Sequence, residues 1–246
     1  IHCGSRGLGH QVCTEHLKVL EGATKKYGIV LPDRQLACAP ITSPEGRAYF
    51  GAMASASNYA WANRQVIMHM VRKVFSGMFD IQYEEMNLVY DVAHNVAKLE
   101  EHVVDGRQMK LCVHRKGATR AFGPGCADLP GEYAPWGQPV IIPGSMGTSS
   151  YLLHGTKEAM VKTFGSTCHG SGRIMSRTKA KKALSGREVR ESLAAEGIII
   201  RAPHDGAIAD EAPEVYKPSD EVVRIVDSAG ISRLVARFVP LGVIKG

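Results

Sequence analysis

Hydrophobic residues recur at helical spacing in the first third of the chain. Residues 11–27 carry apolar side chains at intervals of three and four positions, which predicts an amphipathic helix. Residues 54–76 repeat the pattern more strongly, and either Ser55 or Ser57 can cap the start of this second helix. One apolar stripe opposite basic residues marks it: Tyr59, Val66, Ile67, Met70 and Val74.

The middle of the chain has patterns typical of strands. Residues 88–93 form a short apolar run, and residues 108–114 alternate between apolar and polar side chains. These two segments end near His94 and His114. Residues 115–137 have no period and many turn residues, so we expect a long ordered loop there. Further strands are expected at residues 140–142, 151–153, 198–200, 234–238 and 243–244.

The last third of the chain mixes helices with these strands. Residues 173–184 predict a basic helix, and Ser185 begins a capping box for another helix that Gly197 ends. Ser219 is expected to cap a further helix that ends at Gly230. No internal repeat, linker or low-complexity tract interrupts the pattern. We therefore expect a single α+β domain of mixed sheets with flanking helices across residues 1–246.

Composition places the chain among ordinary globular proteins. Its 246 residues are 44% hydrophobic and 22% charged, which argues against disorder. No run approaches the roughly 18 apolar residues of a membrane span, and the start lacks the layout of a signal peptide. The six cysteines include no C-x-x-C pair, so neither a disulfide framework nor a zinc ribbon is indicated. We expect a soluble, cytoplasmic protein that does not bind membranes.

The net charge of +6 is unevenly distributed. Lysine and arginine cluster in residues 173–190, and such a cluster favours a polyanionic partner such as nucleic acid. A solvated helix face explains about half of such runs, so both interpretations stay open at this point.

His169 has the neighbours that an imidazole needs if a polyphosphate is to approach it. Small residues let the backbone come close to phosphate oxygens, and guanidinium groups can pair with those oxygens in a bidentate way. The alternative, with about equal weight, is a flexible turn before the basic helix. The residues concerned are Gly170, Ser171, Gly172, Arg173 and Arg177.

Four histidines stand where a strand or loop edge meets glycine-rich or basic sequence. They are His2, His94, His114 and His169. Loops at one edge of a sheet converge in space, so their placement favours a shared site, and imidazole is the commonest metal ligand in proteins. For each histidine taken alone, a structural role is favoured over metal binding by about two to one.

Seven segments together resemble the RtcB family of RNA-splicing ligases. The matching motifs occur in the order of the family and span the whole chain, which makes them far more specific together than any one alone. They cover residues 2–11, 58–65, 91–95, 114–121, 143–151, 169–173 and 243–246.

The resemblance implies a GTP-dependent RNA ligase that uses two manganese ions. Such a ligase joins an RNA 3′-phosphate or 2′,3′-cyclic phosphate end to a 5′-hydroxyl end, as in tRNA splicing and RNA repair. His169 would attack the α-phosphorus of GTP and form a covalent guanylate, which suits an activated nucleophile. Its RNA partners would be tRNA halves or broken RNA ends, and protein cofactors in a larger ligase complex are compatible with this function.

The resemblance also implies individual roles. His2 and His94 resemble manganese ligands, a donor type that suits a first-row metal. Arg6, Arg173 and Arg177 resemble cations that grip RNA phosphates. The residues that resemble the GMP-binding set are Ser145, Ser150, His169, Gly170, Ser171, Gly172, Tyr216 and Lys245.

The chain departs from the family pattern at its start, which opens at Ile1 without a methionine. Family members carry an Asp and a Cys metal ligand, a further His ligand and an Asn/Glu pair ahead of this point. We therefore expect the C-terminal half of such a ligase, with the N-terminal part of the family fold missing and no guanylylation by the half alone. The alternatives are a non-catalytic RNA-binding module and a different metal-dependent phosphotransferase.

Overall fold

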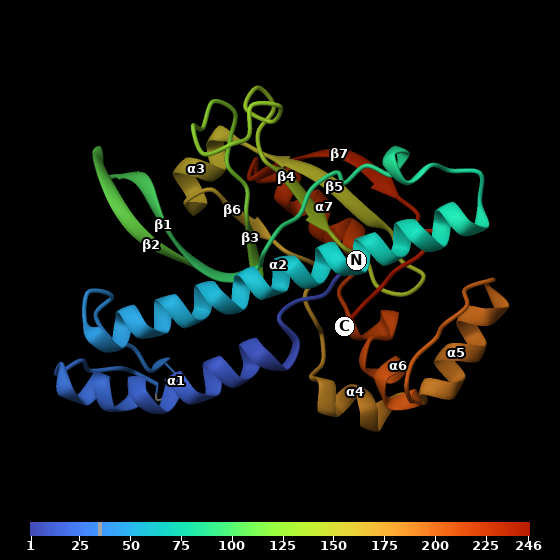
Figure 1. Ribbon diagram of the computed structural model, residues 1–246, viewed down its shortest axis with the longest axis horizontal. Helices are drawn as coiled ribbons and strands as arrows, with labels where there is room; N and C mark the ends of the chain where they lie inside the picture. Colours follow the sequence, from blue (N-terminus) through green and yellow to red (C-terminus); the bar gives the residue numbers. More distant parts are fainter. Residues whose placement is uncertain (34–35) are drawn as a thin grey trace. The chain divides into compact units, whose positions relative to one another are not determined.

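A computed structural model describes residues 1–33 and 36–246 of the chain (Figure 1). These residues form two compact units, Ile1–Asp91 with Ile244–Gly246, and Val92–Val243. Helices and small antiparallel sheets are both present, which confirms the α+β class. The single domain stays a prediction. No helix in the described ranges has the length and apolar character that crossing a membrane requires.

Two long helices make up most of the first unit. Helix α1 spans Arg6–Lys26 and helix α2 spans Pro44–Met78, so both predicted helices are confirmed, and both begin earlier than predicted. They lie side by side and pack against each other (Figure 1). A short 3-10 helix, η2, follows at Tyr83–Glu85.

Helix α2 begins at a different serine from the two that were predicted. The side chain of Ser43 accepts a hydrogen bond from the backbone N–H of Gly46, and Pro44 occupies the first helical turn. Ser55 and Ser57 lie inside the helix, where each hydroxyl donates to the carbonyl oxygen four residues earlier. The prediction was wrong because it started at the first apolar repeat, whereas residues 44–53 also adopt the helix.

The apolar stripe of α2 faces outward for most of its length. Its members that are at least half exposed are Tyr59, Val66, Met70 and Val74. Only a few apolar side chains of the two helices are buried among the described residues. They are Leu20 and Ala23 of α1 and Ala56 of α2. Helical spacing therefore identified the helix correctly but did not identify its buried face.

The second unit contains three small antiparallel sheets. Strand β1 pairs with β2, β3 pairs with β6, and the third sheet has the order β4-β5-β7. Asp105 and Gly106, both with positive φ, form the two-residue turn between β1 and β2. The strand bounds are β1 Asn95–Val104, β2 Arg107–Lys116, β3 Ala118–Arg120, β4 Pro139–Ile142, β5 Ser150–Gly155, β6 Ser166–Cys168 and β7 Ser232–Phe238.

The helices of the second unit are short. Ser185 accepts from the N–H of Glu188 at the start of α5, and Gly197 with φ of 81° follows its end, as predicted. Ser219 does not cap α7: Pro218 holds the cap position, and the Ser219 hydroxyl donates to the carbonyl of Ser149. The bounds are α3 Lys157–Thr163, α4 Arg177–Ala183, α5 Gly186–Ala195, α6 Asp205–Asp210, η3 Pro213–Val215 and α7 Ser219–Ser228.

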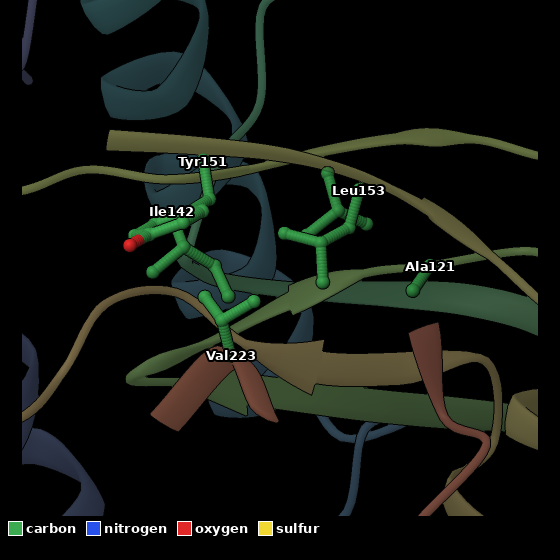
Figure 2. Close-up of a cluster of buried hydrophobic side chains, with 6 residues drawn as sticks. Ala121, Ile142, Tyr151, Leu153 and Val223 are labelled. Carbon is green, nitrogen blue, oxygen red and sulfur yellow. The ribbon is translucent and has the colours of Figure 1, made fainter. Parts of the chain in front are cut away.

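Two apolar clusters form the core of this unit. Figure 2 shows side chains of the first, which lies between the three-stranded sheet and α7 and comprises Ala121, Val140, Ile142, Tyr151, Leu153 and Val223. The second lies among the short helices near η3 and comprises Ala180, Val189, Leu193, Ile208, Ala212 and Val215. Burial of these side chains supplies the hydrophobic stabilisation that positions the loops described below.

Three predicted strands do not form in the described part of the chain. Residues 88–93 are irregular, and β1 begins only after them. Residues 198–200 are irregular as well, although Ile198 and Ile200 pack against the second core cluster. Residues 243–244 contribute one accepted hydrogen bond rather than a ladder. A short apolar run predicts a strand because such runs are usually buried, but here Leu88, Val89 and Ile199 are exposed.

The bounds of other elements also differ from the predicted ones. The strands predicted near residues 108–114, 140–142, 151–153 and 234–238 are confirmed. The predicted loop at 115–137 instead begins with the end of β2 and with β3. The basic helix is shorter than predicted and begins at Arg177, because the side chain of Ser176 accepts from the N–H of Lys179.

Gly155 generates a test of packing in the second unit. A Cβ added there would overlap the backbone of Ala121 and Phe122, which cannot rotate away. We expect Gly155→Ala to lower the free energy of unfolding by about 1–3 kcal/mol or more, as overpacking does. Chemical denaturation measures this. Gly131→Ala is the control, because a Cβ there meets open space. Equal stability of the two variants would contradict the packing described here.

Candidate functional site

Two strand pairings bring His94 and His169 together. His94 directly precedes β1, and β1 pairs with β2 so that Asn95 lies opposite Lys116. Gly117 then leads into β3, and its N–H donates to the carbonyl of His94 at 3.1 Å. Strand β3 pairs with β6, whose last residue, Cys168, immediately precedes His169. The two histidines, 75 positions apart in sequence numbering (169 − 94), therefore meet at neighbouring strand ends.

The two imidazole rings are stacked. Their centroids lie 4.3 Å apart with an angle of 26° between the ring planes. The Nδ1 atom of His169 is buried and has no hydrogen-bond partner among the described residues. A buried imidazole nitrogen without a partner is costly in a purely structural role, so it points to a ligand or partner group.

Gly117 lies against the His169 ring. Its φ of 67° is in the left-handed region that favours glycine, and an added Cβ would lie 3.6 Å from Cε1 and 3.7 Å from Nδ1 of His169. A side chain at this position would therefore cover one edge of the imidazole. The sequence analysis missed Gly117, although a glycine between two strand-forming segments was a usable signal.

Arg173 and Arg177 make ion pairs with two acidic residues. Nη2 of Arg173 lies 3.2 Å from Oδ1 of Asp210, and Nη1 of Arg177 lies 2.6 Å from its Oδ2. Glu211 lies farther from both guanidinium groups, at 3.8 and 3.6 Å. The sequence analysis missed these carboxylates, because acidic residues distant in sequence gave no local pattern. Phosphate binding by the two arginines stays a prediction.

Tyr216 and Ser145 join the same cluster through Glu211. The phenol of Tyr216 donates to Oε2 of Glu211 at 2.7 Å and accepts from Nη1 of Arg173 at 3.1 Å. The hydroxyl of Ser145 donates to the backbone carbonyl of Glu211 at 2.6 Å. The structure therefore brings together Ser145 and Tyr216, predicted to bind GMP, and Arg173, predicted to bind RNA phosphates.

The segment from His169 to Arg173 connects the histidine pair with this cluster. Gly172 has φ of 75°, and its carbonyl accepts from the N–H of Lys217 at 3.0 Å. Arg173 and Tyr216 pair as an isolated antiparallel bridge. Gly170 and Ser171 lie in the irregular part of this segment, and their roles in nucleotide binding stay predictions.

Ser150 has a structural contact in the loop between β4 and β5. Its hydroxyl oxygen accepts from the N–H of Gly144 at 3.0 Å, and Thr148 accepts from the N–H of Ser145 at 2.6 Å. These side-chain contacts fix the loop where a regular ladder is absent. The roles predicted for Ser145 and Ser150 in nucleotide binding stay predictions.

Three further predicted residues belong to the first unit. His2 and Lys245 form an isolated parallel bridge, in which the N–H of His2 donates to the carbonyl of Ile244 at 2.7 Å. The guanidinium of Arg6 also lies near this bridge. A Cβ built on Gly246 would lie 2.8 Å from its Nη1 atom. A common site for these residues and those of the second unit stays a prediction.

The described residues do not by themselves complete a metal site. Within residues 1–33 and 36–246, no group of three or more His, Cys, Asp or Glu side chains is arranged to hold an ion. A first-row metal needs about four donor atoms, whereas His94 is the only residue of the second unit that was predicted to be a metal ligand. The donor set therefore does not fit a complete manganese centre, and the assignments of His2 and His94 stay predictions.

A family comparison decides what kind of chain carries this arrangement. The model of the family described as tRNA-splicing ligase RtcB matches residues 1–246. The chain belongs to the RtcB family. The family prediction is thereby confirmed over the whole sequence.

Archaeal relatives agree with this membership. Over the whole chain, it is 64% identical to a tRNA-splicing ligase RtcB of Archaeoglobus fulgidus and 57% identical to that of Methanococcus maripaludis. It covers 52% of the length of each. A relative of the same name from Methanocaldococcus jannaschii is 58% identical, and 26% of its length is covered. The chain thus spans about half, or less, of these RtcB proteins.

The Tyr216 phenol provides a test of the charge cluster. Burial first, and then the hydrogen bond to Glu211, raises the pKa of Tyr216 to about 12. Because the carboxylate favours the protonated phenol, Glu211→Gln should lower this pKa toward the ordinary value of 10. Burial should keep it above 10. NMR titration with labelled tyrosine measures the shift, and Glu214→Gln, an exposed glutamate nearby, should leave it unchanged.

Proposed function

We propose that this chain is the C-terminal half of an RNA ligase that acts in tRNA splicing and RNA repair. The ligase joins an RNA 3′-phosphate or 2′,3′-cyclic phosphate end to a 5′-hydroxyl end and depends on GTP and manganese. Membership of the RtcB family supports the reaction class, and relatives in that family bear the name tRNA-splicing ligase.

The observation that carries the proposal is the His94–His169 pair. The His169 ring is stacked on a second imidazole, and its Nδ1 is buried without a partner among the described residues. His169 as a residue is only partly buried, so part of it is accessible to a reactant. Gly117, which has no side chain, lies against the Cε1–Nδ1 edge of the ring, where an added Cβ would contact it. These features fit a nucleophile better than a packing residue.

The proposed chemistry uses His169 to carry a guanylate. An imidazole nitrogen attacks the α-phosphorus of GTP, a nitrogen–phosphorus bond forms, and pyrophosphate leaves. The GMP then passes to the RNA 3′-phosphate and creates an activated phosphoanhydride. The RNA 5′-hydroxyl attacks the 3′-phosphorus, the new phosphodiester forms, and GMP leaves. In this scheme His169 both accepts and releases the guanylate.

The charge cluster supports binding of the reacting phosphates. Arg173 and Arg177 are held by Asp210 and Glu211, so their guanidinium groups are preorganised rather than free to rotate. Phosphate oxygens compete well for guanidinium groups because of their charge and their bidentate geometry. A substrate phosphate can therefore replace part of the carboxylate pairing without moving either arginine far.

The test is made in the complete ligase that contains this chain. His169→Ala should abolish the covalent guanylate formed from labelled GTP and manganese, while RNA affinity measured by fluorescence anisotropy changes by less than about twofold, since only a bond-forming group is lost. His10→Ala, which removes an exposed imidazole from α1, is the matched control. RNA joining that survives His169→Ala would overturn His169 as the nucleophile. Unchanged RNA affinity together with no covalent guanylate and no joining by the unaltered ligase would support the non-catalytic RNA-binding module.

The second candidate, the RNA-binding module, has one observation in its favour. Helix α4 carries three exposed lysines, Lys179, Lys181 and Lys182, on a chain with net charge +6. Such a surface binds RNA through its phosphates without any reaction. The His169→Ala comparison separates this function from ligation.

The isolated chain gives a separate prediction. About half of the metal shell implied by the family resemblance lies outside it, and its described residues contain no group of three metal-binding side chains. Incubated alone with GTP and manganese, it should form no covalent guanylate by intact mass spectrometry. One GMP per chain attached at His169 would contradict the assignment as a half ligase, with the complete ligase as the positive control.

A further inference from the structure

Charged side chains are buried inside the β1–β2 hairpin. Glu100 is 4% exposed, Arg115 is 3% exposed and His102 is 4% exposed. Burying a charge is costly unless it is paired and hydrogen-bonded. The Glu100–Arg115 ion pair, with His102 beside it, is therefore favourable only while its hydrogen bonds are complete.

The Arg115–Glu100 pair is bidentate. Nη1 of Arg115 donates to Oε1 of Glu100 at 2.7 Å, and Nη2 donates to Oε2 at 2.9 Å. Nε2 of His102 lies 3.1 Å from the same Oε2. Burial raises the pKa of Glu100, but the hydrogen bonds from Arg115 and His102 outweigh it and leave the pKa below its usual value. Glu100 is therefore ionised at neutral pH.

The same guanidinium also reaches another part of the chain. Nε of Arg115 donates to Oγ of Ser166 at 2.8 Å, and Nη2 donates to the carbonyl of Phe164 at 2.9 Å. Phe164 and Gly165 both have left-handed backbone, with φ of 51° and 59°, where α3 turns into β6. Arg115 thus fixes a turn whose geometry no regular ladder determines.

Both ends of this cross-link lead directly to the histidine pair. Ser166 is the first residue of β6, and His169 follows the end of that strand. Arg115 lies two residues before Gly117, whose N–H holds the carbonyl of His94. The guanidinium of Arg115 therefore joins the β1–β2 hairpin, which His94 directly precedes, to β6, which His169 directly follows.

We propose that Arg115 is a positioning residue. It keeps the rings of His94 and His169 stacked on each other by linking the β1–β2 hairpin to β6. Its effect on catalysis rests on the proposed function, whereas its effect on the ring pair does not. Lysine cannot replace it, because an ammonium lacks the planar fork that serves Glu100, Ser166 and Phe164 at once.

The experiment compares Arg115→Lys with a variant that only weakens the core. Val140→Ala removes fully buried volume in β4 without touching the cross-link. Both variants are made in the complete ligase, and their melting temperatures establish that they are folded. Histidine-labelled samples then report the nuclear Overhauser contact between the His94 and His169 rings, which needs no turnover.

We expect Arg115→Lys to lose the ring contact and to slow single-turnover guanylylation by about tenfold or more, because small misplacements of a reacting group are costly. GTP affinity should change by less than about twofold, since Arg115 does not reach the charge cluster. Val140→Ala should keep both the ring contact and the rate.

Two outcomes would overturn the proposal. One is an intact ring contact in Arg115→Lys, and the other is a loss of contact and rate in Val140→Ala as large as in Arg115→Lys. If the unaltered ligase forms no covalent guanylate, the proposed function fails, but the ring contact still decides the role of Arg115.

Discussion

The antiparallel pairing of β3 with β6 is the constraint on which the candidate site depends. Each strand has only three residues, and their register places Cys168 opposite Ala118. That pairing sets His169 beside Gly117, and Gly117 in turn holds the backbone of His94. Such a short ladder has little stability of its own, so it relies on neighbouring side-chain contacts. The guanidinium of Arg115, bonded to Ser166 at the edge of this ladder, supplies one of them.

The charge cluster follows a similar logic. Its arginines are held by carboxylates from the end of α6, and Tyr216 is kept protonated by burial and by Glu211. Opposite charges that are paired in the absence of substrate keep long side chains ordered, which reduces the entropy lost when a phosphate binds. The segment from His169 to Arg173 links this cluster to the histidine pair through the Arg173–Tyr216 bridge and the hydrogen bond from Lys217 to Gly172.

Local signals predicted local structure well, and each failure has a physical cause. The capping box at Ser185 and the periodicity of α1 and α2 depend on residues within a few positions, so the sequence revealed them. Residues 88–93 looked like a strand because apolar runs are typical of buried strands, but Leu88 and Val89 are exposed. The acidic partners of Arg173 and Arg177 were missed because they lie far from both arginines in the sequence. The four candidate histidines were singled out by their placement at strand and loop edges, and the family motifs gave roles to three of them. The stacking of His94 on His169 could not be predicted, because the contact of two distant rings leaves no local pattern.

The first unit is discontinuous in sequence, and its ends are joined by backbone hydrogen bonds. The partner of the His2 N–H is Ile244, which is synthesised after all of the second unit. Closing such a long loop is slow, because chain entropy must be lost before the contact forms. The continuous second unit can therefore form its core before residues 244–246 pair with the start of the first unit. The contact between His2 and Ile244 is thus the long-range closure of the first unit, and it can form only after residues 92–243 have been synthesised.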